Sequence, residues 1–390
     1  MAAGRPVIDV DVPADGVAEL AEPVAAEGDL AFLQHSSGTT GLKKGVCLSH
    51  GAVLTQIGHY AAAIGLTPDD RVASWLPLYH DMGLITSFLM PAVCGIPIVS
   101  LDAQEWVLKP TLLLDAIEHH RASLCWLPNF AFLHIARLAE PERQWDLSSL
   151  RLVVNCSEPC RAKAFDVFAE RFAASRLPAD ALQTSYAMAE NVFAVTQTLP
   201  GRPVRRGRGA FLSSGPPLTG VEIRIVGEDP GEIVLRSDCL FGGYFRQPEL
   251  TAARLRDGWY HTGDIGFLAG GELFVVGRLD DVLNLNGRKL IAHELEDALN
   301  GVAGIAPGRV LVYADFDEAA GAAQLVVAAE LAGDGGDAGV AQAVRHAVMA
   351  QCGLRPHRVR LLARGFLIKS TSGKISRAAS IAKLQNDGAP

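Results

Sequence analysis

Short apolar runs and longer amphipathic segments alternate along the first 200 residues. Almost wholly apolar runs with β-branched or aromatic residues predict buried strands, and apolar residues three and four apart predict helices. Because strands that alternate with helices form parallel sheets covered by helices, we expect ligands to bind at the carboxyl ends of these strands. The pattern predicts strands at 29–37, 70–78, 123–129 and 150–159, helices at 50–65, 109–122, 130–140 and 160–174, and a buried helix running into a strand at 84–101.

The pattern changes after about residue 210, where short strands are separated by glycine and proline turns. The sequence "LAGGEL" (268–273) predicts a hairpin, and region 210–279 is expected to form a small antiparallel β subdomain. From Asp280 onward, helical and strand patterns are mixed in a compact segment. We therefore predict an α/β protein with a large N-terminal α/β domain over 1–279 and a small α+β C-terminal domain over 280–390.

Composition narrows the function classes. The chain of 390 residues is 49% apolar and 20% charged, which is ordinary for a globular protein. Its formal net charge of -8 argues against a nucleic-acid partner, whose binding surface would be basic. The seven cysteines form no CxxC pair, the N-terminus lacks an apolar targeting region, and Pro91, Gly95 and Pro97 interrupt the longest apolar stretch. We expect free thiols, no membrane span and a cytoplasmic protein.

The stretch "HSSGTTGLKKG" (35–45) carries the first candidate chemistry. Backbone N–H groups that glycine leaves open can surround phosphate oxygens, and a lysine adds positive charge. A Walker loop requires GxxxxGK followed by Ser or Thr, and neither lysine here precedes such a residue. The spacing therefore excludes a P-loop NTPase, and taken alone the loop is as compatible with a structural role as with phosphate binding.

Further motifs give this loop a family context. The pattern [ST]SG[ST]TGxxKG resembles the phosphate-binding loop of the adenylate-forming superfamily, which includes acyl-CoA synthetases, fatty acyl-AMP ligases, peptide-synthetase adenylation domains and luciferases. Two stretches, "WLPLYHDMGL" (75–84) and "NCSEP" (155–159), resemble fatty acyl-AMP ligases in particular. The resemblance spans about residues 30–380. The later superfamily motifs are resembled, in order, by "YAMAE" (186–190), "YHTGDIG" (260–266), "GRLDDVLNLNGRKLIAHELE" (277–296) and "LIKSTSGKISR" (367–377).

The resemblance implies a ligase that uses ATP and Mg²⁺ to form an acyl-adenylate and passes the acyl group to the thiol of CoA or of a carrier-protein phosphopantetheine. Attack of a carboxylate on the α-phosphate brings two anions together, so cations and hydrogen-bond donors should dominate catalysis. By resemblance, Glu190 would hold Mg²⁺. Lys374, carried by a mobile C-terminal domain with its hinge at Asp280, would reach the α-phosphate. The β- and γ-phosphates would be cradled by Ser36, Ser37, Gly38, Thr39, Thr40, Gly41 and Lys44.

The resemblance also assigns nucleotide contacts. Asp264 would accept both ribose hydroxyls, Arg278 would reach the ribose or the α-phosphate, and Tyr186 would stack on the adenine. Ala187 stands where the family usually has glycine, which would crowd the backbone near the nucleotide. The other nucleotide contacts would come from Ser157, Glu158, Pro159, Ala187, Met188 and Ala189.

The acyl substrate and the acceptor stay open at this point. His80 would gate the acyl pocket, and Asp81 follows it where amino-acid-activating members have an aspartate that pairs with the substrate amine. Apolar walls at 84–90 and 126–132, which include Asn129 and Phe130, favour a hydrophobic acid. The front motifs resemble acyl-AMP ligases, whereas the hinge segment resembles CoA synthetases. The alternatives are an amino- or aryl-acid adenylating enzyme of a natural-product pathway and a truncated, non-adenylating partner that binds acyl-adenylate or nucleotide.

The phosphate loop begins at residue 36, whereas relatives carry a long N-terminal section before it. We therefore expect a truncated N-terminal domain. A sheet that lacks part of its layer exposes apolar surface, so we also expect a homodimer or a complementing subunit.

Overall fold

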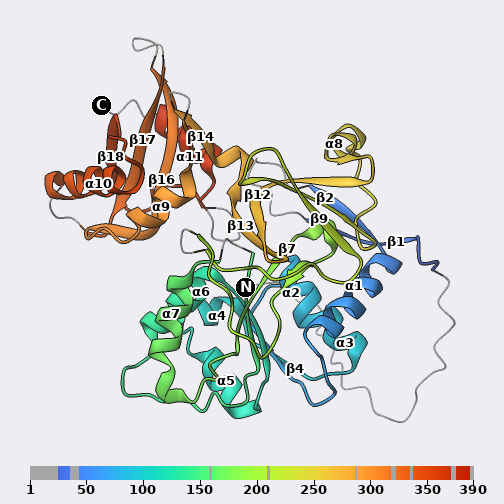
Figure 1. The fold of residues 1–390 in the computed structure, drawn as a ribbon. Coiled ribbons are helices and arrows are strands. Elements are labelled where there is room, and N and C mark those ends of the chain that lie inside the picture. The colour runs from blue at the N-terminus through green and yellow to red at the C-terminus, as the bar shows by residue number, and fades with distance from the viewer. Residues whose placement is uncertain are drawn as a thin grey trace, which may run out of the picture.

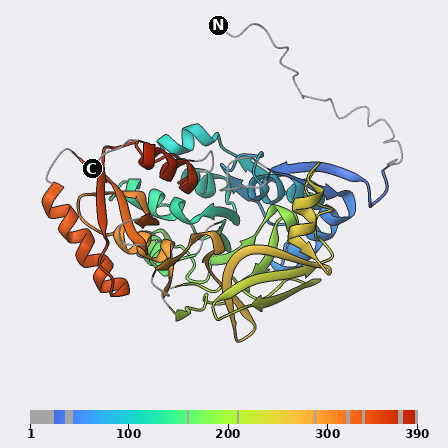
Figure 2. The same ribbon diagram turned by 90° about the horizontal axis from the view of Figure 1, so that it is seen from above.

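The computed structural model describes residues 25–35, 44–157, 160–208, 211–285, 288–317, 322–333, 337–369 and 375–386. Its elements form two groups (Figures 1 and 2): a six-stranded sheet with its helices and a β subdomain, and a smaller group of C-terminal elements, coloured orange to red, to one side. This mixed α/β architecture confirms the predicted fold class.

The six-stranded sheet has the strand order β4-β3-β5-β6-β7-β8. Pairing is parallel from β4 to β7 and antiparallel between β7 and β8, so the predicted parallel sheet is confirmed. Every residue of β3, β5 and β6 is buried, which is why these strands read as continuous apolar runs. The strands are β3 (Val72–Ser74), β4 (Ile98–Ser100), β5 (Leu124–Pro128), β6 (Leu152–Cys156), β7 (Leu182–Ala187) and β8 (Ala194–Gln197).

Four helices of this group follow the predicted alternation: α1 (His50–Ala63), α5 (Leu112–His120), α6 (Asn129–Leu138) and α7 (Ala162–Arg171). Helix α4 (Ala103–Leu108) was not predicted. The apolar stretch 84–101 is helix followed by strand, as predicted: α2 (Asp81–Leu84) continues through a π-helical turn (Ile85–Leu89) into α3 (Met90–Cys94), and β4 follows.

The strand predicted at 70–78 is shorter in the structure. Strand β3 ends at Ser74, whose hydroxyl accepts a hydrogen bond from the backbone N–H of Leu76 at 3.1 Å. Pro77 then has no N–H to give to a neighbouring strand. The residues that follow therefore leave the sheet and lead to His80 and Asp81 at the start of α2.

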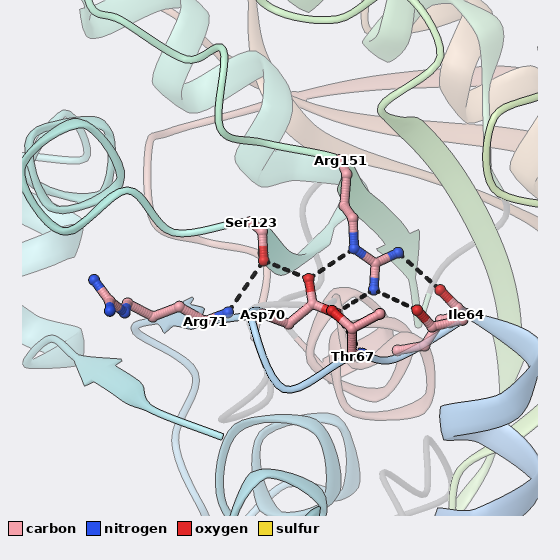
Figure 3. A network of polar contacts seen from close by, with 7 residues as sticks. Ile64, Thr67, Asp70, Arg71, Ser123 and Arg151 are labelled. Carbon is pink, nitrogen blue, oxygen red and sulfur yellow. Dashed lines mark hydrogen bonds and ion pairs between the residues drawn. The ribbon is translucent and has the colours of Figure 1, made fainter. Parts of the chain in front are cut away.

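Asp70 joins the entry to β3 to the entry to β6 (Figure 3). Arg151 donates to both of its carboxylate oxygens, and Ser123 donates to Oδ1 at 2.7 Å. Arg151 also donates to the carbonyl of Ile64 at 2.8 Å, at the end of α1. Burial alone would raise the pKa of Asp70, but these hydrogen bonds and the charge of Arg151 lower it to about 2. This network fixes the edge of the sheet opposite the carboxyl ends of its strands.

Two antiparallel units lie beside the central sheet. The β subdomain is confirmed as a five-stranded sheet, and a separate hairpin pairs β1 (Leu30–His35) with β2 (Gly45–Ser49). Val46 bridges to Tyr244, and Cys47 N–H donates to the carbonyl of Gly243 at 3.0 Å, so this hairpin is attached to the subdomain. The subdomain contains β9 (Val221–Val226), β10 (Gly231–Ser237), α8 (Pro248–Arg254), β11 (Leu255–Arg256), β12 (Trp259–Ala269) and β13 (Glu272–Arg278).

The C-terminal elements pack around hydrophobic clusters of their own. Strands β16 and β17 are antiparallel and β18 pairs with β17 in parallel. The division of the chain at Asp280 remains a prediction. The elements are β14 (Val282–Leu285), β15 (Arg288–Ile291), α9 (Ala292–Leu299), β16 (Ile305–Asp317), β17 (Ala322–Leu331), α10 (Asp337–Cys352), β18 (Arg358–Leu362) and α11 (Arg377–Asn386).

All seven cysteines are free, as expected. Within the described ranges, none of the helices combines the length and apolar character needed to cross a membrane. A homodimer or complementing subunit remains a prediction.

Candidate functional site

A cavity of about 1510 Å³ is lined by residues of the central sheet, the β subdomain and the C-terminal elements. It brings together most of the described residues that the sequence singled out, but no residue of the predicted wall at 84–90 lines it. Ser36, Ser37, Gly38, Thr39, Thr40, Gly41, Glu158, Pro159 and Lys374 lie outside the described residues. The predicted residues that line the cavity are Lys44, His80, Asp81, Asn129, Phe130, Ser157, Tyr186, Ala187, Met188, Ala189, Glu190, Asp264, Arg278 and Asp280.

Asp264 is held by two side chains of the cavity. The β12–β13 register places it opposite Arg278, whose Nε donates to Oδ1 at 3.0 Å. Tyr186, on β7, donates its hydroxyl proton to Oδ2 at 2.6 Å. The charge of Asp264 raises the pKa of Arg278, which therefore stays a cation. Both carboxylate oxygens are thus oriented by hydrogen bonds before any ligand arrives.

Tyr186 has a contact that the sequence did not predict. Its adenine-stacking role is a prediction, whereas its hydroxyl orients Asp264. Burial, followed by the negative charge of Asp264, raises the pKa of Tyr186 well above its usual value. The hydroxyl therefore stays protonated and keeps donating to the carboxylate.

Glu190 lies on a short 3₁₀ turn directly after β7 and is buried. Tyr244 donates its hydroxyl proton to Glu190 Oε1 at 2.7 Å, and the hydroxyl oxygens of Tyr244 and Tyr260 are 3.0 Å apart. The backbone N–H of Phe241 donates to the Glu190 carbonyl at 2.9 Å. Burial, and then the charge of Glu190, raises the pKa of Tyr244, so Tyr244 remains a donor.

Tyr244 and Tyr260 are site residues that the sequence reasoning missed. Tyr244 is 54 positions from Glu190, and nothing in the spacing links the two residues. The available signal was the position of Tyr260 directly before "HTGDIG", since a tyrosine that opens a site motif is a candidate for an inward-pointing side chain.

Lys44 approaches the same carboxylate from the β1–β2 hairpin. Its ammonium group is 5.4 Å from the centroid of the Tyr244 ring, within range of a cation–π interaction. Burial and the positive charge of Arg254 lower its pKa, while the charge of Glu190 opposes that shift. Lys44 and Glu190 therefore bring opposite charges to Tyr244.

His80 and Asp81 form a pair at the start of α2. His80 Nδ1 contacts Asp81 Oδ1, and the backbone N–H of Met82 donates to the same oxygen at 2.9 Å. Asp81 therefore already has polar partners within the chain. Ser157, at the end of β6, has a φ of 76° and donates to Met82 Sδ at 3.7 Å, which draws this loop towards α2.

Aromatic side chains form one wall of the cavity. Phe130 packs edge-on against Trp75 and Trp106, at centroid distances of 6.4 and 6.3 Å, and these two indoles stack at 3.6 Å. Asn129 accepts a hydrogen bond from Asn155 at 2.8 Å. Trp106 was missed in the sequence, because it comes from a different helix than the predicted walls.

Arg278 and Asp281 flank the predicted hinge and are held from opposite sides. Arg278 pairs with Asp264 in the β subdomain, whereas Arg377 of α11 pairs with Asp281 at 3.0 Å. Asp280 lies between them and is exposed. Lys369 and Ile375, which flank the segment containing Lys374, form an antiparallel bridge, and both line the cavity.

Residues 4–245 match the family described as AMP-binding enzyme. The chain belongs to this family. It is thereby placed in the superfamily of adenylate-forming enzymes, as the motifs predicted. Within this part of the chain lie the residues from Lys44 to Tyr244 discussed above.

Named relatives of this AMP-binding enzyme activate acids. Over 439 residues it is 30% identical to a 4-hydroxyphenylalkanoate adenylyltransferase of Mycobacterium marinum, covering 98% of this chain and 70% of that protein. It is also 30% identical to a long-chain-fatty-acid–AMP ligase of the same organism, covering 98% and 74%. The solved structure of McyG A-PCP complexed with phenylalanyl-adenylate superposes with a TM-score of 0.83 at 26% identity, covering 94% of this chain and 59% of that one.

The carboxylate of Glu190 fits a magnesium ion. Mg²⁺ prefers oxygen ligands and is usually bound by one or two carboxylates together with substrate phosphates. Glu190 lines the cavity, and the hydrogen bond from Tyr244 occupies one side of Oε1 only, which leaves acceptor positions on the carboxylate.

Proposed function

We propose that this AMP-binding enzyme is an ATP-dependent ligase that activates a hydrophobic carboxylic acid as its acyl-adenylate and transfers the acyl group to the thiol of CoA or of a carrier-protein phosphopantetheine. One observation carries the proposal: a single cavity is lined by Glu190, Lys44 and the Asp264–Arg278 pair. Family membership supports the use of ATP.

In the first step, a carboxylate oxygen of the acid attacks the α-phosphorus, the bond from that phosphorus to the bridging oxygen breaks, and pyrophosphate leaves. Asp264 would bind the ribose hydroxyls, since its two oxygens are already oriented by Tyr186 and Arg278. Lys44 would bind the outer phosphates. Cations fixed in place lower the barrier because they do not have to reorganise as negative charge builds up.

Glu190 would hold Mg²⁺, which when bound neutralises phosphate charge. The protein's own contribution is to fix the carboxylate: Tyr244 donates to Oε1, and Tyr260 lies beside Tyr244. Because the Glu190 carboxylate is held in one orientation, we propose that the β- and γ-phosphates bind in one position, near Lys44.

In the second step, the acceptor thiol attacks the acyl carbon, a thioester forms, and AMP leaves with the carboxyl oxygen that bridged to phosphorus. We propose that Asp280 is the hinge that exposes the site to the thiol. Two contacts support this assignment: Arg278 is tied to Asp264 and Asp281 is tied to Arg377, so Leu279 and Asp280 are the residues left between the two anchors. Lys374 would act in the first step, since its neighbours Lys369 and Ile375 border the cavity.

The acyl pocket favours an acid without an α-amine. An aspartate that binds the amine of a substrate needs a carboxylate whose oxygens are not already paired within the protein. Asp81, by contrast, already contacts His80 and the Met82 N–H. Aryl-acid activation is the second candidate, because Phe130 and Trp106 give the cavity an aromatic wall.

ATP–pyrophosphate exchange with a panel of fatty, aryl and amino acids tests the proposal. We expect exchange with fatty acids, weaker exchange with aryl acids and none with amino acids. Exchange with amino acids alone would contradict the assignment of Asp81. ATP binding without exchange for any acid would identify a non-adenylating binding partner instead. Adding CoA or a phosphopantetheinylated carrier protein to the loaded enzyme then distinguishes the two acceptors by which thioester forms.

A further inference from the structure

Three potential metal ligands meet away from the cavity. His59 lies on α1, and Asp238 and Cys239 directly follow β10. One ligand atom from each lies within 4.8 Å of the other two, and no other group of this kind occurs in the described part of the chain. None of the three lines the cavity, so the cluster is separate from the proposed adenylation site.

The distances suit a tetrahedral ion. His59 Nδ1 is 3.8 Å from Asp238 Oδ1, and the Cys239 sulfur is 3.4 Å from the same oxygen. Zinc binds nitrogen, oxygen and sulfur ligands at about 2.0–2.3 Å in tetrahedral geometry, so its ligand atoms are roughly 3.3–3.8 Å apart. Two of the three ligand separations therefore match such an ion, and the third, from His59 to Cys239, lies within 4.8 Å.

The donor types point to zinc rather than to magnesium or calcium. Imidazole nitrogen and thiolate sulfur are ligands that zinc accepts, whereas magnesium and calcium prefer oxygen alone. His59 Nδ1 is buried and has no hydrogen-bond partner among the described residues. Buried polar atoms are normally paired, so a coordinated ion would satisfy this nitrogen.

We propose that His59, Asp238 and Cys239 form a zinc-binding site, with water as the fourth ligand. On binding, the S–H bond of Cys239 breaks, its proton passes to solvent, and a sulfur–zinc bond forms. The side chain of Asp238 is 52% exposed, which gives the ion a path from solvent, while Cys239 is buried.

Local structure places these ligands. Cys239 N–H donates to Ser237 Oγ at 3.0 Å, which forms a tight turn at the end of β10. A side chain at Gly220, which has a φ of 76°, would begin 2.4 Å from the Asp238 carboxylate. Glycine at this position therefore leaves the space that Asp238 occupies.

A bound ion would cross-link α1 to the segment that leads from β10 to Tyr244. That segment also contains Phe241, whose N–H donates to the Glu190 carbonyl. The site would thereby stabilise the folded protein and the backbone beside Glu190. The inference does not depend on the proposed ligase activity.

Titration of the full chain with Co²⁺, a spectroscopic substitute for zinc, tests the site. We expect one ion per chain with a thiolate-to-metal charge-transfer band that zinc abolishes by competition. In Cys239→Ser the band should be lost, and in His59→Gln the affinity should fall roughly tenfold or more, because each ligand contributes to binding. Cys94→Ser is the matched control: its thiol is exposed and lies outside the cluster, so the band should remain.

Thermal unfolding keeps the test decisive if a variant folds poorly. Zinc should raise the Tm of the unmodified chain and of Cys94→Ser, and at the same zinc concentration it should raise the Tm of a folded His59→Gln by less. No charge-transfer band in the unmodified chain, or a band that Cys94→Ser removes, would overturn the proposal.

Discussion

Asp264 and Asp281 both line the cavity, yet their carboxylates are held by different parts of the molecule. Asp264 is fixed by Tyr186 and Arg278, which belong to the central sheet and the β subdomain. Asp281 is paired with Arg377, which begins the last helix. The proposed nucleotide side of the cavity, at Asp264, is therefore organised within one group of elements, whereas Asp281 is held by a C-terminal element.

The comparison assigns different roles to the two sides. Groups that are fixed before the ligand binds contribute affinity and orientation without further ordering. Groups carried by elements that move can reach the reacting atoms in one step and leave in the next. Arg161, which precedes α7, pairs with Asp297 of α9 at 2.8 Å and joins the two groups across this boundary.

The largest effect is expected for Lys374, which we propose is carried by the mobile C-terminal elements. Lys374→Ala should lower the rate of pyrophosphate exchange by about 10²–10³-fold, because it removes a cation from the transition state. Lys369→Ala is the matched control, since Lys369 also borders the cavity. Equal losses in the two variants would show that general positive charge, rather than Lys374, is what the reaction requires.

On the fixed side, Asp264→Asn should raise KM for ATP by roughly 10–100-fold, because hydrogen bonds to a charged group contribute about 1.5–3 kcal/mol each. Tyr186→Phe removes a single donor to Asp264 and should have a smaller effect. Steady-state exchange at varied ATP concentration measures both. An unchanged KM for ATP in Asp264→Asn would show that Asp264 does not bind the ribose.

Asp70→Asn should separate stability from catalysis. We expect a loss of about 2 kcal/mol in the free energy of unfolding, because Arg151 loses a carboxylate partner, and no change in KM. Urea unfolding measures the first quantity and exchange kinetics the second. A large change in KM would mean that the Asp70 network acts on the site as well.

The lowered pKa of Asp70 also predicts how the free energy of unfolding depends on pH. The folded-state pKa of Asp70, about 2, lies below its usual value of 3.8, so the unfolded chain binds more protons between these values. The stabilisation is complete above the unfolded pKa and is lost as the pH falls towards 2. Asp70→Asn should therefore unfold with a shallower acid dependence than the unmodified chain, and equal slopes would contradict the contribution of Asp70.

Tyr244→Phe should raise the Mg²⁺ concentration needed for half-maximal exchange by roughly tenfold, as expected when the partner of a metal-binding side chain is removed. Excess Mg²⁺ should restore most of the rate. Tyr260→Phe is expected to have less effect, because the Tyr260 hydroxyl contacts the Tyr244 hydroxyl, and it is Tyr244 that donates to the carboxylate. A Tyr244→Phe variant with lower rate at every Mg²⁺ concentration would indicate a role other than orienting Glu190.

The smallest effect is expected for the contact between the two groups of elements. Arg161→Gln should change the ratio of acyl transfer to adenylation by no more than about fivefold, in keeping with about 0.2–1 kcal/mol for a partly exposed ion pair. Arg206→Gln is the control, since Arg206 pairs with Asp166 within the N-terminal elements. Identical ratios in all three proteins would show that the Arg161–Asp297 pair has no part in the movement.

The order of strands and helices was predictable because buried parallel strands are continuous apolar runs. Their ends were less predictable, since β3 is cut short by a side-chain turn at Ser74. Resemblance to the family's motifs pointed to Glu190 and Asp264, and both line one cavity. The support of Glu190 by Tyr244 was not predictable, because strand register and loop packing, rather than sequence distance, bring these residues together.

The candidate site depends on the length of a turn that lies far from it, the turn between β12 and β13. Gly270 and Gly271, with φ of 60° and 80°, join the strands in a two-residue turn. The register set by this turn shifts by one residue between Ile265 and Gly266, and the turn and the shift together place Asp264 opposite Arg278. Because neighbouring positions on a strand face opposite sides, a further shift of one residue would turn Arg278 away from Asp264. A designer who inserts a label should therefore avoid this exposed tip, although it lies at the opposite end of the hairpin from the cavity.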